Sequence, residues 1–182
     1  MNKQNLLANF SMFEDLDAVS FMKIWSHYDT DQSGSLDSPE EIEAFARDLL
    51  AAGGGEVTEL QLKDLLAGLS ELCDTDGDGS LGLAELAGFL PVEANFLDHF
   101  NGREPLTQSQ LEEIFGHYDT DGSGTIQGDE LAALMRDLLR RFDREPTKAE
   151  IDLYTAQIMG FIDADANAGL DLAELSRLFP KG

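Results

Sequence analysis

The chain has 182 residues, and 36 Asp and Glu against 12 Lys and Arg give it a formal net charge of −24. This charge argues against nucleic acids and anionic membranes as partners, because both repel an acidic protein, and it favours the binding of cations. Hydrophobic residues make up 42% of the sequence, which excludes a disordered acidic tail and allows one or two domains with real cores.

The sequence carries no sign of export or of membrane insertion. Its single cysteine, Cys73, cannot form an intramolecular disulfide, which suits a reducing compartment. No apolar run approaches the roughly 18 residues of a membrane span, and the N-terminus lacks the apolar core of a signal peptide. We therefore expect a cytoplasmic protein. Since no nucleophile–base pair or phosphate loop is visible, we expect no enzyme.

The chain starts with a polar segment, residues 1–15, where we expect a tail or a short helix. From Leu16 to Tyr28 apolar residues recur at helical spacing, and Asp17 is the expected N-cap. A different pattern follows directly, with oxygen-bearing side chains at alternate positions: Asp29, Asp31 and Ser33, then Gly34. The same alternation begins again at Asp74, Asp119 and Asp163.

This alternation is typical of the calcium loop of an EF-hand. Calcium takes about six to eight oxygen ligands, and the loop supplies them from side chains at positions 1, 3 and 5, a backbone carbonyl at position 7 and a bidentate glutamate at position 12. Position 9 often acts through water. Position 6 turns with a positive φ, which favours glycine. Four such loops predict an all-α protein with four EF-hands.

Loop 2 meets every requirement, and loop 3 departs from it only in having serine, a weaker oxygen donor, at position 5. In loop 2, residues 74–85, the expected calcium ligands are Asp74, Asp76, Asp78, Ser80 and Glu85. In loop 3, residues 119–130, they are Asp119, Asp121, Ser123, Thr125 and Glu130, with Gln127 at position 9.

Loop 1 offers two choices for its closing glutamate, after the expected ligands Asp29, Asp31, Ser33 and Ser35. Counting twelve residues from the first aspartate ends at Glu40, whereas Ser38-Pro39-Glu40-Glu41 reads as a capping box that favours Glu41. Spacing also favours Glu41, because it lies 89 residues before Glu130, just as Glu85 lies 89 residues before Glu174, although loops 1 and 3 begin 90 residues apart. We expect a 13-residue loop with one residue inserted near Asp37, Glu41 as the bidentate ligand and Glu40 as the alternative.

Loop 4, residues 163–174, lacks the glycine at its turn. Its expected ligands are Asp163, Asp165, Asn167, Gly169, Asp171 and Glu174. Ala168 occupies position 6, and forcing alanine into a left-handed conformation costs on the order of 1 kcal/mol. We expect loop 4 to bind calcium more weakly than its acids suggest, with Gly169 allowing the turn to relax. The chain as a whole is expected to bind up to four calcium ions, with magnesium as a possible occupant in the apo-like state.

The four hands are expected to form two pairs. The helices before loops 2 and 4 begin 16 residues ahead of their loops and those before loops 1 and 3 begin 12 ahead, so the repeated unit is a pair of hands. We expect pair 1 over residues 16–91, a linker with a short helix over residues 92–105, and pair 2 over residues 106–182. The expected capping boxes are Thr58 with Gln61, Thr107 with Gln110 and Thr147 with Glu150.

An apolar residue stands at position 8 of every loop. These residues are expected to join the two loops of each pair through a short antiparallel β contact. They are Leu36, Leu81, Ile126 and Leu170.

Three stretches outside the loops resemble the calbindin–calretinin–secretagogin family of calcium-binding proteins. They are Phe21-Met22-Lys23-Ile24-Trp25, Arg47-Asp48-Leu49-Leu50 and Leu90-Pro91-Val92-Glu93-Ala94-Asn95-Phe96-Leu97. The family usually has six hands, whereas this chain has four. The resemblance implies a cytosolic calcium buffer that in some cases binds a target protein.

The sequence leaves the choice between buffer and sensor open. A sensor exposes a hydrophobic groove, often rich in methionine, for an amphipathic helix of a partner. Only five methionines are present, which favours the buffer. The alternative is a calcium-dependent adaptor that binds a target helix. A carrier that encloses a luminescent small molecule has less support, because its cavity needs aromatic and histidine linings.

Overall fold

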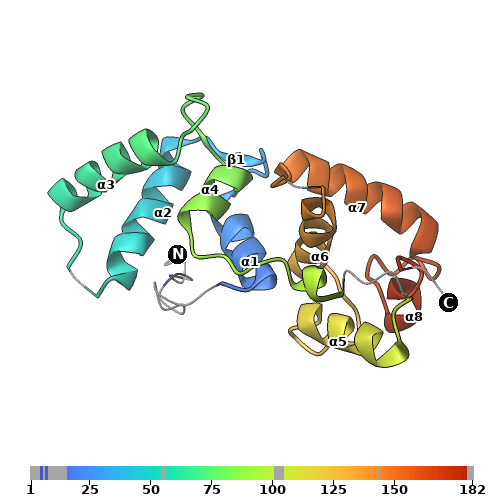
Figure 1. The fold of residues 1–182 in the computed structure, drawn as a ribbon. Coiled ribbons are helices and arrows are strands. Elements are labelled where there is room, and N and C mark those ends of the chain that lie inside the picture. Colours follow the sequence, from blue (N-terminus) through green and yellow to red (C-terminus); the bar gives the residue numbers. More distant parts are fainter. Residues whose placement is uncertain are drawn as a thin grey trace. The chain divides into compact units, whose positions relative to one another are not determined.

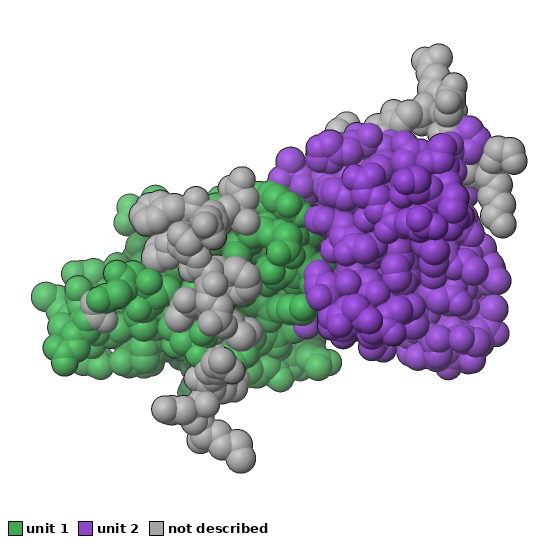
Figure 2. Space-filling view, turned by 90° about the horizontal axis from the view of Figure 1, so that it is seen from below, with its two compact units in different colours: residues 1–93 green, residues 94–182 purple. Residues whose placement is uncertain are grey.

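The computed structural model describes residues 5, 7, 16–54, 56–100, 105–142 and 144–179. The predicted tail or short helix over residues 1–15 therefore lies, apart from Asn5 and Leu7, outside the described residues. The chain divides into two compact units, residues 1–93 and residues 94–182 (Figure 2). This division falls inside the segment predicted to be a linker, and each unit holds two of the four loops.

Unit 1 consists of helices joined by the first two loops (Figure 1). Its elements are α1 (Ala18–Tyr28), β1 (Ser35–Leu36), α2 (Pro39–Ala52), α3 (Glu59–Leu72), β2 (Leu81–Gly82) and α4 (Leu83–Phe89). The predicted N-cap of α1 is confirmed, since the Asp17 carboxylate accepts a hydrogen bond of 2.7 Å from the Ser20 backbone N–H. Helix α2 begins at Pro39 behind its N-cap Ser38, as the sequence predicts.

Unit 2 repeats this order around the third and fourth loops (Figure 1). Its elements are the 3₁₀ helix η2 (Phe96–Phe100), α5 (Gln108–Tyr118), α6 (Asp129–Arg140), α7 (Lys148–Ile162) and α8 (Leu172–Leu175). The three capping boxes that start α3, α5 and α7 are formed as predicted. Reciprocal capping satisfies backbone N–H groups that a helix start otherwise leaves unbonded, which explains why local sequence located these starts well.

The two loops of each unit are joined by the predicted antiparallel contact. In unit 1, Leu36 pairs with Leu81 in the two-stranded sheet β1–β2. In unit 2, Ile126 and Leu170 exchange two backbone hydrogen bonds of 2.9 Å. All four side chains are buried. The prediction of an all-α fold with paired EF-hands and a short β contact in each pair is thus confirmed.

Helices α1 and α2 contribute many of the buried residues of unit 1, and α5 and α6 contribute many of those of unit 2. Trp25 is fully buried, and Cys73 is a buried free thiol. By contrast, α3 buries only Leu62 and Leu69. Phe89, the last residue of α4, is 40% exposed. No helix in the described part of the chain is long and apolar enough to cross a membrane.

Residues 92–100 of the segment expected to be a linker include residues that make contacts within unit 1 or within unit 2. Val92 forms a parallel bridge with Leu16 inside unit 1. The helix expected from residue 92 instead begins at Phe96, and it follows Asn95, whose side-chain amide donates a 2.7 Å hydrogen bond to the Asp137 carbonyl on α6. The short helix therefore belongs to unit 2, and its contacts are to residues far along the chain.

Candidate metal centres

Each of the four loops brings three carboxylates together. Within each triad, one carboxylate oxygen from each residue lies within 4.8 Å of the other two. Oxygen donors so grouped suit a hard divalent cation, because calcium prefers several oxygens and tolerates irregular geometry. The triads are Asp29, Asp31 and Glu41; Asp74, Asp76 and Glu85; Asp119, Asp121 and Glu130; and Asp163, Asp165 and Glu174.

The aspartate at position 1 organises each loop by accepting backbone hydrogen bonds from positions 5 and 6. In loop 3 its two oxygens accept from the N–H groups of Ser123, at 2.9 Å, and Gly124, at 3.0 Å. The corresponding bonds are 3.0 and 3.3 Å in loop 1, 3.1 and 3.0 Å in loop 2, and 3.2 and 3.1 Å in loop 4. The backbone thus wraps around the same carboxylate in all four loops.

The closing glutamate is held by the residue at position 2. Its Oε1 accepts the backbone N–H of Thr30, Thr75, Thr120 and Ala164 at 2.8, 2.7, 2.9 and 2.7 Å. The three threonine hydroxyls add bonds of 2.8, 3.0 and 2.9 Å. These bonds bring the end of each loop back to its beginning, which is what a bidentate ligand at the last position requires.

In loop 1 the structure places Glu41, and not Glu40, in the carboxylate triad. Glu41 is buried, whereas Glu40 is exposed on the first turn of α2. Asp37 stands as an extra residue between Leu36 and the N-cap Ser38, while in loop 2 the N-cap Gly82 directly follows Leu81.

The predicted capping box at Ser38 is only half formed, and this leaves an oxygen of Glu41 unbonded. Ser38 accepts from the Glu41 N–H, but the reciprocal bond is missing. In loop 2 that reciprocal bond exists, since Gly82 donates to Glu85 Oε2 at 2.8 Å. Glu41 Oε2 is instead buried without a hydrogen-bond partner. A buried carboxylate oxygen without a partner is costly, so this atom fits a bound cation.

Burial and hydrogen bonding act in opposite directions on the loop 1 carboxylates. Burial raises the pKa of Asp29 above its usual value. Burial also acts to raise the pKa of Glu41, but the hydrogen bonds with Thr30 and Ser38 together outweigh it and leave that pKa below its usual value. The closing glutamate is therefore held in its charged form, which is the form that binds a metal ion.

Two positions in each loop adopt a left-handed backbone. Position 6 has a φ of 91° at Gly34 and 84° at both Gly79 and Gly124, but loop 4 places Ala168 there with a φ of 64°. Position 4 is also left-handed, at Gln32, Gly77, Gly122 and Ala166. Sequence reasoning identified the strain at Ala168 and missed the second one at Ala166, which has a φ of 57°.

Gly169 has a different role from the one expected of it. It does not take up the turn, because Ala168 itself is left-handed. A Cβ on Gly169 would come within 3.2 Å of the Thr125 Cβ in loop 3, so the residue allows close approach of the paired loops. Its N–H also donates a 2.7 Å bond to Asn167 Oδ1.

The predicted ligands at positions 5 and 7 lie next to each other. Ser33 Oγ donates to the Ser35 carbonyl at 2.8 Å, and Ser123 Oγ donates to the Thr125 carbonyl at 2.9 Å. In loop 2, Asp78 Oδ1 accepts from the Ser80 hydroxyl and from the Ser80 N–H, and these hydrogen bonds lower the pKa of Asp78. At the end of loop 4, Asp171 caps α8 by accepting from the Glu174 N–H at 2.7 Å.

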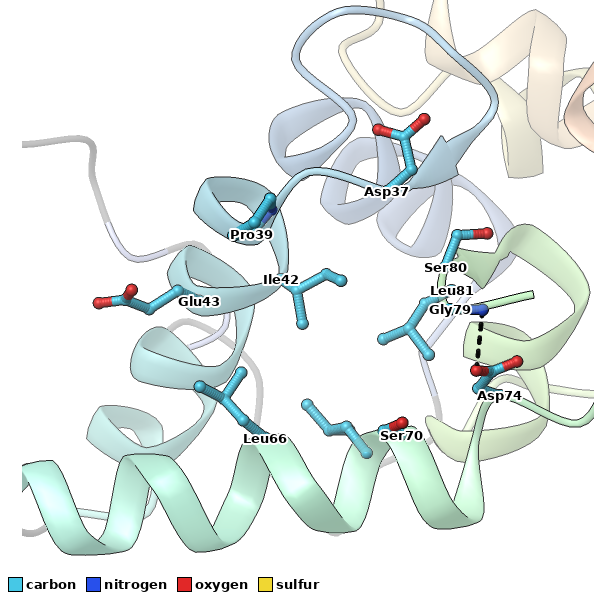
Figure 3. Close-up of a pocket in the computed structure, with 11 residues that line it drawn as sticks. Asp37, Pro39, Ile42, Glu43, Leu66, Ser70, Asp74, Gly79, Ser80 and Leu81 are labelled. Carbon is cyan, nitrogen blue, oxygen red and sulfur yellow. Dashed lines mark hydrogen bonds between the residues drawn. The ribbon is translucent and has the colours of Figure 1, made fainter. Parts of the chain in front are cut away.

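A cavity of about 330 Å³ adjoins loop 2 in unit 1. Ile42, Leu66 and Leu81 point into the space bounded by α2, α3 and β2 (Figure 3). Asp74 also lines it and accepts a 3.0 Å hydrogen bond from the Gly79 N–H. The cavity is therefore apolar on one side and shares residues with a candidate metal site.

Comparisons with known proteins agree with the loop geometry. Residues 71–136, which contain loops 2 and 3, match the family model of the EF-hand domain pair. Calretinin of Bos taurus is 36% identical over 148 residues, 81% of this chain and 54% of that protein. Calbindin-32 of Drosophila melanogaster is 34% identical over 174 residues, 91% of the chain and 56% of that protein.

Calbindin of Rattus norvegicus is 34% identical over 171 residues, which is 94% of the chain and 65% of that protein. The chain thus spans between about half and two thirds of the length of these curated relatives.

Proposed function

Because the chain is a calbindin- and calretinin-like EF-hand protein, we propose that it binds calcium through its four loops and acts as a calcium buffer. The observation that carries this proposal is the recurrence of one carboxylate triad, with the same hydrogen-bond frame, in four loops. Because these hydrogen bonds already hold the loop backbone around the carboxylates, less conformational entropy would be lost when an ion binds.

The residues that would hold the ion are those expected from the loop pattern. The aspartates at positions 1 and 3 and the closing glutamate supply carboxylate oxygens, and positions 5 and 7 add a side-chain and a backbone oxygen. Bound calcium would offset the repulsion among the acids of each loop. We propose Glu41 as the bidentate ligand of loop 1.

Burial of methionine supports a buffer over a sensor. Met22 and Met135 are fully buried in their cores, and Met159 is partly buried. Sensors present flexible methionines to their targets, so the described methionines of this chain do not form such a surface.

Calorimetric calcium titration tests the proposal. The unsubstituted chain is expected to bind up to four ions, and Glu41→Gln is expected to weaken or abolish one of these sites. Glu40→Gln is the matched control, because it removes a neighbouring acid that lies outside the triad. An unsubstituted chain that binds no calcium would contradict the proposal, and loss of a site in Glu40→Gln alone would contradict the assignment of Glu41.

The cavity beside loop 2 favours a second candidate function, a calcium-dependent adaptor. The cavity is lined by apolar residues and also by the acidic residues Asp37, Glu43 and Asp74. This lining would suit an amphipathic helix that carries basic residues beside its apolar face. Binding of such a synthetic peptide with calcium but not with chelator would support the adaptor. Equal binding of a hydrophobic dye in the two conditions would count against it.

A further inference from the structure

A tyrosine–aspartate hydrogen bond joins the two helices of the first hand, and the same bond recurs in the third hand. Tyr28 Oη donates to Asp48 Oδ2 at 2.8 Å, and Tyr118 Oη donates to Asp137 Oδ2 at 2.7 Å. Both tyrosines are buried. Asp48 and Asp137 lie outside the loops and are not members of the carboxylate triads.

The position of this bond relates it directly to the calcium loops. Each tyrosine immediately precedes the aspartate at position 1 of its loop, and each aspartate partner lies seven residues after the closing glutamate. Seven residues are about two helical turns, so the glutamate and the aspartate share one face of the helix. The bond therefore connects the residue before the first ligand to the helix that carries the last one.

A second hydrogen bond fixes the same aspartate from outside the hand. Asn95 Nδ2 donates to the Asp137 carbonyl at 2.7 Å, and Asn5 Nδ2 donates to the Asp48 carbonyl at 3.0 Å. The two asparagines are 90 residues apart, which is the offset between the two loops. The duplicated unit thus includes the segment ahead of each odd-numbered hand as well as the hands themselves.

The second and fourth hands are built differently at the same place. Cys73 and Ile162 stand where the other hands have tyrosine, and neither side chain offers a hydroxyl. In the fourth hand the Arg177 side chain donates to the Ile162 carbonyl at 2.8 Å instead. The tyrosine–aspartate bond is therefore a feature of the odd-numbered hands.

We propose that Asp48 and Asp137 are positioning residues for calcium, which hold the first and last ligands of loops 1 and 3 at their binding separation before the ion arrives. This inference rests on the proposed function. A hydrogen bond from a hydroxyl to a carboxylate is stronger than a hydrogen bond between two neutral groups. Each tyrosine–aspartate bond can therefore resist separation of the two helices that it joins. Its loss would add an ordering step to calcium binding.

The test uses a chain with Glu85→Gln and Glu174→Gln, in which loops 1 and 3 remain. In calorimetric titration, Tyr118→Phe is expected to weaken one of the two remaining sites about three- to tenfold, and Tyr28→Phe the other. Tyr154→Phe is the matched control, because it removes a hydroxyl from a side chain that is 41% exposed on α7. That variant should leave both sites unchanged.

Rescue by a conservative change separates positioning from mere packing. Asp48→Ala should weaken site 1 as much as Tyr28→Phe does, and the double variant should be no weaker than either, because both remove one bond. Asp48→Asn keeps an oxygen that accepts from Tyr28 and should retain most of the affinity.

Melting temperatures give a further distinction, since a purely structural bond would lower them equally in calcium and in chelator. Unchanged affinity of both sites in the two tyrosine variants, in a chain that still binds two ions, would overturn the inference. If the doubly substituted background does not fold, the Gly34 and Gly124 amide NMR signals can report sites 1 and 3 separately in the otherwise unsubstituted chain. Absence of calcium binding by the unsubstituted chain would instead overturn the proposed function, and the inference with it.

Discussion

Gly169 lies against Thr125, so that a Cβ added to the glycine would come within 3.2 Å of the threonine Cβ. The contact joins position 7 of loop 4 to position 7 of loop 3, beside the backbone pair of Ile126 and Leu170. The two loops of unit 2 are therefore close enough that the shape of one constrains the other.

Gly169→Ala is expected to weaken calcium binding at sites 3 and 4 together. The added methyl group forces one loop away from the other and disturbs the shared bridge, and overpacking of this kind typically costs about 1–3 kcal/mol. Calcium titration of the variant measures the effect. Gly160→Ala, on α7 where no neighbouring atom lies within 4 Å of the added Cβ, is the control. Loss at site 4 with site 3 intact would show that the contact does not couple the loops.

Replacing the two left-handed alanines of loop 4 should strengthen its site. Ala166 and Ala168 have φ values of 57° and 64°, and each pays a cost on the order of 1 kcal/mol that glycine avoids. Glycine also has more freedom in the unfolded chain, so the net gain is expected to be below tenfold for each change. Calorimetry on Ala166→Gly and Ala168→Gly measures it. Gly77→Ala and Gly79→Ala, at the matching positions of loop 2, should weaken site 2.

The features that sequence could predict are those set by neighbouring residues. Helix starts depend on capping side chains three residues apart, and ligand triads depend on fixed offsets, so both could be read from the chain. The link between Tyr118 and Asp137 spans 19 residues and that between Asn95 and Asp137 spans 42. Neither partner has a role in the loop pattern, and such contacts depend on how the helices pack.

The left-handed conformation of Ala166 was missed for a different reason. The calcium-loop pattern specifies ligands and one glycine, and position 4 contributes no side chain to it. Comparison of the four loops could have given the signal, because loops 2 and 3 have glycine at that position, in Gly77 and Gly122.

Lowering the pH should reveal the contribution of Glu150 to the stability of the fold. Glu150 belongs to the capping box of α7 and pairs with Arg144. Hydrogen bonds from the Arg144 guanidinium and the Thr147 backbone lower the pKa of Glu150 from 4.5 to about 2. A carboxylate with a lowered pKa stabilises the fold above its unfolded pKa, and this stability is lost as the pH falls through the folded value. The contribution is therefore full above pH 4.5 and disappears towards pH 2.

Glu150→Gln isolates this contribution, because glutamine forms the same capping box at Gln61 and Gln110. The melting temperature of the variant in chelator should lie below that of the unsubstituted chain at neutral pH and meet it near pH 2. The difference should be small, since an ion pair at an exposed site is screened by solvent. A constant difference over this range would show that ionisation of Glu150 is not its cause.

Removal of calcium should lower the melting temperature, and salt should recover part of the loss. Four ions add eight positive charges and change the formal net charge from −24 to −16, so the chain without calcium carries stronger self-repulsion. A ligand that binds only the folded state also stabilises it by mass action.

Thermal unfolding in chelator and in calcium, each at low and high potassium chloride, measures both effects. Since salt screens repulsion, it should raise the melting temperature more in chelator than in calcium. Equal melting temperatures with and without calcium would contradict the expectation, and a salt response confined to the calcium-loaded chain would exclude charge repulsion as its cause.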